Sequence, residues 1–141
     1  MKRYMAYSQM QKNKYIMDVD GNSFTERFPN LLQSGSLVFK STRYKEWYTE
    51  RLVPYEDYIP VNYDQSDLVE KVAWAYRHPD LMNNITKHAL KTIQEQVRTE
   101  DMRCYVYRLM IEYQTLFEAS WRGSTQFFEC TVSSAFSFLI G

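Results

Sequence analysis

The sequence predicts an α/β fold in which a small parallel sheet is followed by a run of helices. Residues 14–19 and 36–40 each predict a short strand, and residues 24–33 between them predict a helix. Two strands joined by a helix in so short a segment form a strand–helix–strand unit, and this kind of crossover makes the strands parallel. From Ser66 onward the apolar residues follow the helical period instead.

The connection between the two strands contains a turn and a helix start. Residues 20–23, Asp-Gly-Asn-Ser, predict a turn, and Ser23 is a residue type that commonly caps a helix N-terminus. Pro29 lies inside the predicted helix. The helix therefore either kinks at Pro29 or begins near Phe28 with Pro29 in its first turn.

A third strand and three helices follow. The segment between the second strand and Ser66 is rich in aromatic residues, for which packing between strands and helices is the expected role. The last part of that segment, residues 57–61, predicts a third short strand. Helices are predicted from Ser66 to Pro79, over residues 81–97 and over residues 100–121.

Capping and packing signals accompany these helices. Asp67 and Glu70 have the spacing of a capping box. Asp80 follows the break at Pro79 and is positioned to cap the next helix. The helix predicted from Ser66 has one apolar face, formed by Leu68, Val69, Val72, Ala73 and Tyr76.

Composition excludes some classes of partner. The chain has 141 residues, with 17 Lys plus Arg and 17 Asp plus Glu. This balance produces no basic field, so we expect no nucleic acid partner. The two cysteines, Cys104 and Cys130, fit no metal-binding spacing, so we expect no metal site. The two cysteines leave a disulfide open, but for Cys104 we favour a free, buried thiol.

The chain divides into three segments. Residues 1–13 form a lead-in without a signal-peptide pattern, residues 14–121 form the domain, and residues 122–141 form an atypical apolar tail. The apolar run in the tail is too short to span a bilayer, which takes about 20 residues. The tail fits a packed final segment, an end that contacts a membrane, or sequence foreign to the domain.

The first motif with chemical meaning is the pair Asp18 and Asp20 at the end of the first strand. The run Asp-Val-Asp-Gly resembles the first motif of haloacid-dehalogenase-type phosphatases, in which one Asp is the nucleophile and the second is a general acid and base beside Mg²⁺. That constellation also needs an acidic pair after a later strand, and the sequence offers none. A magnesium-dependent phosphatase is therefore a remote alternative.

The same turn is a candidate anion cradle. Gly21 allows close approach of the backbone to a ligand, and a helix start after Ser23 offers unpaired N–H groups. Arg27, one helical turn later, is able to fork onto phosphate oxygens. Lys40 lies at the carboxyl end of the second strand, where open α/β sheets bind ligands. The plain alternative is a capped helix with a solvated Arg27 and a surface Lys40.

An ordered series of motifs over roughly residues 14–118 carries a more specific signal. Its parts in chain order are Lys14 to Phe24, Arg27 with Phe28, Leu31 with Leu32, Ser34 to Lys40, Trp47 with Tyr48, Leu52 with Pro54, Tyr58 to Val61, Asp67 with Leu68, Met102, Cys104 with Tyr105, and Tyr113. Together these residues resemble the CAP10 family, glycosyltransferase family 90. That family includes fungal capsule-associated xylosyltransferases and animal protein O-glucosyltransferases.

The resemblance implies a type B glycosyltransferase fold with two Rossmann-like halves, of which this chain looks like the second, donor-binding half. It implies that Arg27 holds the diphosphate of a UDP-sugar. The turn formed by Gly21, Asn22, Ser23 and Phe24 would lie against the phosphates and the nucleoside. Lys40 is a further implied contact.

The implied reaction is inverting transfer of the sugar to an acceptor hydroxyl, with neither cofactor nor metal, in the lumen of the secretory pathway. The resemblance assigns the catalytic base and the glycan or protein acceptor site to a first half that this sequence lacks. We therefore expect an incomplete enzyme that binds a UDP-sugar. A non-catalytic remnant or interaction module of the same fold is the alternative.

Overall fold

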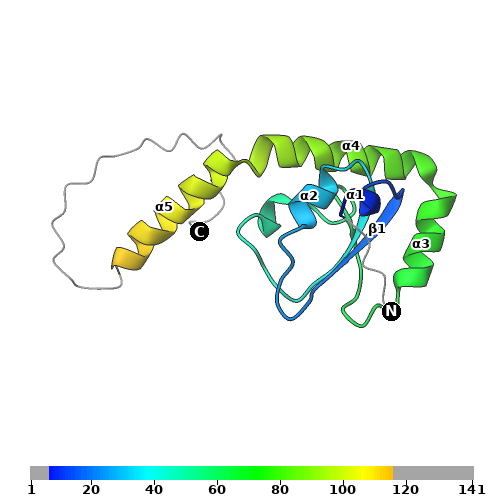
Figure 1. The fold of residues 1–141 in the computed structure, drawn as a ribbon, viewed down its shortest axis with the longest axis horizontal. Helices are drawn as coiled ribbons and strands as arrows, with labels where there is room; N and C mark the ends of the chain where they lie inside the picture. The colour runs from blue at the N-terminus through cyan, green and yellow to red at the C-terminus, as the bar shows by residue number, and fades with distance from the viewer. Residues whose placement is uncertain (1–6, 116–141) are drawn as a thin grey trace. The chain divides into compact units, whose positions relative to one another are not determined.

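The computed structural model describes residues 7–115 of the chain (Figure 1). Residues up to Val97 belong to one compact unit, and a second unit begins at Arg98. Within the predicted lead-in, residues Tyr7–Met10 form a short helix, α1. Predictions for the tail fall outside the described residues.

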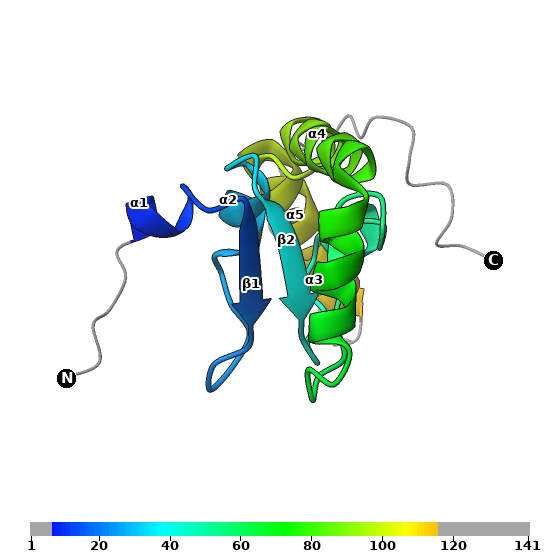
Figure 2. The same cartoon turned by 90° about the vertical axis from the view of Figure 1, so that its right-hand side faces the viewer.

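A three-stranded parallel sheet forms the centre of the first unit, which confirms the α/β prediction. The strands are β1 (Tyr15–Val19), β2 (Leu37–Ser41) and β3 (Ile59–Pro60), in that spatial order. Figure 2 shows β1 and β2 side by side and pointing the same way. The register pairs Asp18 with Lys40. Because side chains alternate along a strand, these two lie on the same face of the sheet as Ile16 and Val38.

The helix between β1 and β2, α2 (Phe28–Leu32), begins later than residue 24, and the alternative start near Phe28 is confirmed. Pro29 fits this first turn because it has no N–H group to leave unpaired. Ser23 is therefore not the N-cap, which is Arg27 without a side-chain capping bond. The physical reason is that Thr25 and Arg27 both donate to Asp18, which holds the preceding segment as a loop.

Three longer helices follow, α3 (Leu68–Arg77), α4 (Pro79–Gln96) and α5 (Thr99–Thr115), after a single 3₁₀ turn at Thr49–Arg51. Helix α4 begins at Pro79, two residues earlier than predicted, so that His78 and not Asp80 is its N-cap. The capping box at Asp67 is also wrong. Its carboxylate accepts the N–H of Asn62 and pairs with Lys71.

The packing face of α3 differs from the predicted one. Leu68 and Val72 pack against the core as expected, but the buried position is Ala75, while Val69 and Tyr76 are 81% and 77% exposed. The positions that pack against the core, Leu68, Val72 and Ala75, follow the spacing i, i+4, i+7. The predicted face included Val69 and Tyr76, each one position further along the chain, which point to solvent. Ala75 is buried in the cluster that contains Leu37, Phe39 and Ile59 of the sheet.

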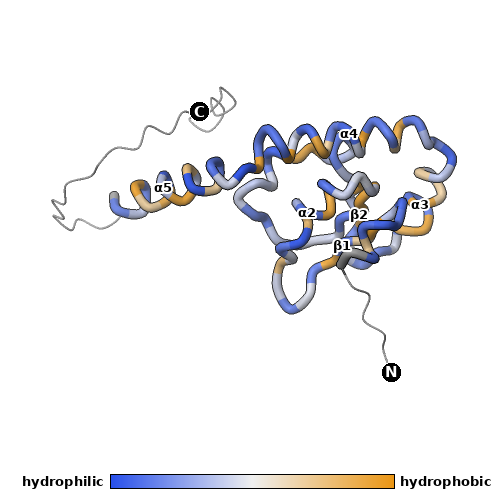
Figure 3. Tube along the Cα trace, turned by 45° about the horizontal axis from the view of Figure 1, so that its top comes forward, coloured by the Kyte–Doolittle hydropathy of each residue, from blue (hydrophilic) through white to orange (hydrophobic). Residues whose placement is uncertain are grey.

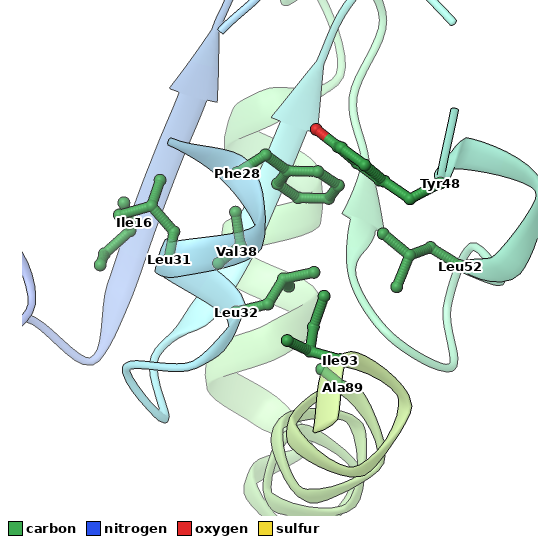
Figure 4. Packing of buried hydrophobic residues seen from close by; sticks show 9 residues of the cluster. All are labelled: Ile16, Phe28, Leu31, Leu32, Val38, Tyr48, Leu52, Ala89 and Ile93. Carbon is green, nitrogen blue, oxygen red and sulfur yellow. The ribbon is translucent and has the colours of Figure 1, made fainter. Parts of the chain in front are cut away.

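Two hydrophobic clusters cover the two faces of the sheet. Figure 4 shows the first, in which β1, β2, α2 and the C-terminal part of α4 meet. The second joins the other face of the sheet to α3 and the N-terminal part of α4. Figure 3 shows the apolar side of α4 turned toward the sheet. The first cluster consists of Ile16, Phe28, Leu31, Leu32, Val38, Tyr48, Leu52, Ala89 and Ile93. The second consists of Leu37, Phe39, Ile59, Val61, Ala75, Met82 and Ile85.

Cys104, on α5 in the second unit, is disulfide-bonded, so the prediction of a free thiol is wrong. Among the described residues no helix is long and apolar enough to cross a membrane.

Candidate anion-binding site at the carboxyl edge of the sheet

The candidate site is built around the buried carboxylate of Asp18, near the end of β1. The side chain is fully buried, and three side chains donate to it. On Oδ2 it accepts the Thr25 hydroxyl at 2.8 Å and the Lys40 ammonium at 2.7 Å. On Oδ1 it accepts Nε of Arg27 at 2.7 Å. One negative charge thus lies between two positive charges, and the cluster keeps a net positive charge.

Arg27 is the member of the cluster that reaches solvent. Its Nε bonds to Asp18 and its Nη2 bonds to the carbonyl oxygen of Val19 at 3.0 Å. The side chain is nevertheless 41% exposed, and Nη1 has no hydrogen-bond partner among the described residues. The guanidinium is therefore fixed on one edge and open on the other, which is the arrangement that a bound phosphate needs.

Lys40 is buried, so the alternative of a surface lysine is wrong. Its ammonium donates to Asp18 and, at 3.2 Å, to the hydroxyl of Thr25. It also lies 4.5 Å from the centroid of the Phe28 ring. The side chain is only 5% exposed. In this structure Lys40 holds Asp18 in place, and its direct contact with a ligand stays a prediction.

The predicted turn after β1 is exposed along its whole length, from Gly21 through Asn22 and Ser23 to Phe24. The Gly21 N–H donates to the Ser23 carbonyl oxygen at 3.0 Å. A side-chain carbon added at Gly21 would meet nothing within 4 Å, so the space beside this backbone is open. The prediction that a helix begins after Ser23 and offers its unpaired N–H groups to an anion is wrong, because α2 begins only at Phe28 and is five residues long.

The structure brings further residues to this edge that the sequence analysis did not assign. Asp20 accepts the Thr42 hydroxyl at 2.7 Å and the Arg43 N–H at 2.9 Å, which ties the loop after β1 to the loop after β2. The guanidinium of Arg43 lies 3.5 Å from the centroid of the Tyr63 ring. The rings of Phe24 and Tyr44 meet edge to face at 6.5 Å.

The sequence does offer a feature by which these residues could be assigned to the site, which is their position directly after predicted strands. Parallel strands place their carboxyl ends at one edge of the sheet, so the residues that follow β1, β2 and β3 gather there. Exposed aromatic rings and arginines at one edge are able to stack on a base and bind phosphate oxygens.

The phosphatase alternative does not fit this geometry. A nucleophilic carboxylate must reach its substrate, and Asp18 is fully buried with both oxygens accepting hydrogen bonds. Asp20, the expected acid and base, is bound to the loop after β2. In the part of the chain that the structure describes, His, Cys, Asp and Glu side chains form no group of three that could hold a metal ion.

Glu46 adds a titratable group close to the cluster. Burial raises the pKa of its carboxyl group above the ordinary value; the Tyr48 hydroxyl and the Lys40 ammonium oppose this effect, and Asp18 and Asp20 reinforce it. An ionised Glu46 therefore carries a desolvation cost beside the buried ion cluster.

Asp18→Asn is expected to reduce the free energy of unfolding by about 3–5 kcal/mol, because it leaves the buried ammonium of Lys40 without its counter-charge. Urea denaturation measures this loss. The exposed Glu26→Gln removes the same charge and should change stability little. Adding Lys40→Met to Asp18→Asn should recover much of the loss, and an Asp18→Asn variant as stable as the wild type would contradict the ion-cluster account.

Glu46→Gln is expected to stabilise the protein at neutral pH and to lose this advantage below the unfolded pKa of 4.5. The raised pKa means that the folded state binds the proton more tightly than the unfolded chain. The ionised carboxylate of Glu46 therefore lowers the stability of the folded state at neutral pH and not below pH 4.5. Urea denaturation at neutral pH and below pH 4.5 compares Glu46→Gln with the wild type, and the exposed Glu50→Gln is the control. An equal difference at both pH values would contradict the assignment.

Known proteins provide an independent comparison. The chain matches the model of Glycosyl transferase family 90 over residues 1–135. It is 34% identical over 113 residues to Protein O-glucosyltransferase 3 of Rattus norvegicus, covering 79% of this chain and 22% of that protein. It is 33% identical over 116 residues to Protein O-glucosyltransferase 2 of Danio rerio, covering 81% and 23%.

A third relative is Protein O-glucosyltransferase 1 of Rattus norvegicus, 33% identical over 103 residues, which cover 72% of this chain and 26% of that protein. The chain thus spans about a quarter of the length of these relatives. The resemblance found in the ordered motifs is confirmed, and the chain belongs to glycosyl transferase family 90.

Proposed function

We propose that this chain carries the UDP-sugar-binding part of a glycosyltransferase. The observation that supports this best is the half-exposed guanidinium of Arg27, which a buried carboxylate holds at the carboxyl edge of a parallel sheet. In our proposal Nη1 and the outer N–H of Nη2 bind the diphosphate. Open α/β sheets bind nucleotides at this edge, and arginine matches phosphate geometry.

Each predicted site residue has a part in this proposal. The open backbone of Gly21, Asn22 and Ser23 lies against the phosphates, and Phe24 takes part in holding the nucleoside. The exposed rings of Tyr44 and Tyr63, from the next two loops, supply further stacking surface for the base. The buried Lys40 acts by fixing Asp18, and through it Arg27.

For the reaction of the whole enzyme, our proposal rests on the names of the relatives. We infer that the donor is UDP-glucose or a closely similar UDP-sugar and that the acceptor is a hydroxyl group of a protein, as the name protein O-glucosyltransferase indicates for the relatives. Transfer with inversion needs a base that deprotonates the acceptor, and Arg27 would stabilise the leaving UDP. The base and the acceptor site come from a partner half in a type B fold, in the secretory lumen.

The test is calorimetry of the full chain with UDP. Arg27→Ala should weaken binding about tenfold or more, because it removes charge-assisted hydrogen bonds to the diphosphate. Arg77→Ala removes the same charge from an exposed helix position, where the side chain bonds to the Ala73 carbonyl oxygen. It should bind UDP like the wild type.

Two outcomes would overturn the proposal. Equal affinity of wild type and Arg27→Ala would remove the site assignment. The absence of any UDP binding by the folded wild-type chain would favour a non-catalytic module of the same fold.

A further inference from the structure

A second candidate site is a pocket beside the turn that precedes β3. It has a volume of about 610 Å³ and opens between this turn and the helices α3 and α4. This size falls within the range of small-molecule sites. Its lining consists of Tyr55, Glu56, Trp74, Leu81, Asn84, Ile85 and His88.

A buried carboxylate organises this pocket. Asp57 is 1% exposed, and its Oδ2 accepts the N–H of Val53 at 2.7 Å, which closes the turn. Its Oδ1 lies 2.8 Å from Nδ1 of His88 on α4. Since a carboxylate only accepts hydrogen bonds, Nδ1 of His88 is the donor. This leaves Nε2 as the polar atom of a half-exposed imidazole at the pocket, held in one orientation by its partner.

The turn also places an aromatic ring at the pocket by means of an unusual backbone conformation. Tyr55 has a φ of +67°, in the left-handed region that a bulky residue rarely adopts. Its N–H donates to the Tyr58 carbonyl oxygen at 2.8 Å, and Asp57 holds the same turn. The Tyr55 side chain is 51% exposed. Backbone strain of this kind recurs at ligand sites, where it positions a side chain.

The lining combines an apolar wall with a polar rim. Tyr55, Trp74, Leu81 and Ile85 provide the apolar surface. A carboxylate, a carboxamide and an oriented imidazole lie beside it, from Glu56, Asn84 and His88. A pyranose ring has the matching character, because its C–H face packs on aromatic rings while its hydroxyl groups both donate and accept hydrogen bonds.

We propose that this pocket is a carbohydrate subsite that takes one pyranose ring, with Trp74 and Tyr55 contacting the sugar face and His88, Asn84 and Glu56 binding its hydroxyl groups. The carboxylates of Glu56 and Asp57 disfavour phosphates and other anions. The subsite goes beyond the proposed donor site, because it recognises a sugar without its nucleotide.

The experiment is an NMR titration of the full chain with methyl β-D-glucopyranoside. We expect saturable shifts of the Trp74 indole N–H and of the His88 imidazole. His88→Gln and Asn84→Ala should each weaken binding about threefold to tenfold, the effect of one lost hydrogen bond. Trp74→Leu should abolish it. Tyr76→Ala is the matched control, because it removes an aromatic ring that is 77% exposed on the same helix and does not line the pocket.

The outcomes separate this subsite from the donor site. Titration with UDP should shift resonances of Arg27 and leave those of Trp74 unchanged, so either site can fail alone. Chemical-shift dispersion shows that each variant is folded. Three results would each overturn the proposal. The first is the absence of a saturable shift with the glucoside, and the second is equal glucoside affinity of the wild type and the folded variants His88→Gln and Asn84→Ala. The third is tighter binding of inorganic phosphate or tetramethylammonium at the same residues.

Discussion

The fully buried charge of Asp18 constrains much of the first unit. An ionised carboxylate away from water is stable only when hydrogen bonds and counter-charges surround it. Lys40 meets this requirement from the neighbouring strand, through the parallel register that pairs the two residues. Thr25 and Arg27 meet it from the loop after β1. The same contacts therefore favour the β1–β2 register, hold the loop in place and delay the start of α2.

This arrangement also explains why Arg27 is suited to an anion. A guanidinium on an ordinary surface loop would lose side-chain freedom on binding a phosphate. Here two hydrogen bonds already fix it, to Asp18 and to the Val19 carbonyl oxygen. The two cations share a single carboxylate, so the cluster retains positive charge close to solvent. This pre-organised positive charge is the reason for which we propose Arg27 as the group that binds a diphosphate.

The local patterns predicted the elements well and the contacts between them poorly. Short apolar runs and turn residues located β1, β2 and β3, because strand periods and turn chemistry are properties of neighbouring residues. The burial of Lys40 and the pairing of Asp57 with His88 were not foreseen, since both depend on how distant elements pack. On α3, the exposure of Val69 shows the same limit: an apolar residue marks no particular face until the sheet selects one.

The central claim, that Asp18 holds Arg27 ready for a diphosphate, can be tested directly by following the Nε–H resonance of Arg27 in ¹⁵N-labelled protein during a UDP titration. The account predicts saturable shifts of this resonance, together with the backbone amides of Gly21, Asn22, Ser23 and Phe24, at one common dissociation constant. Saturable UDP binding that leaves Arg27 and this turn unchanged would contradict it.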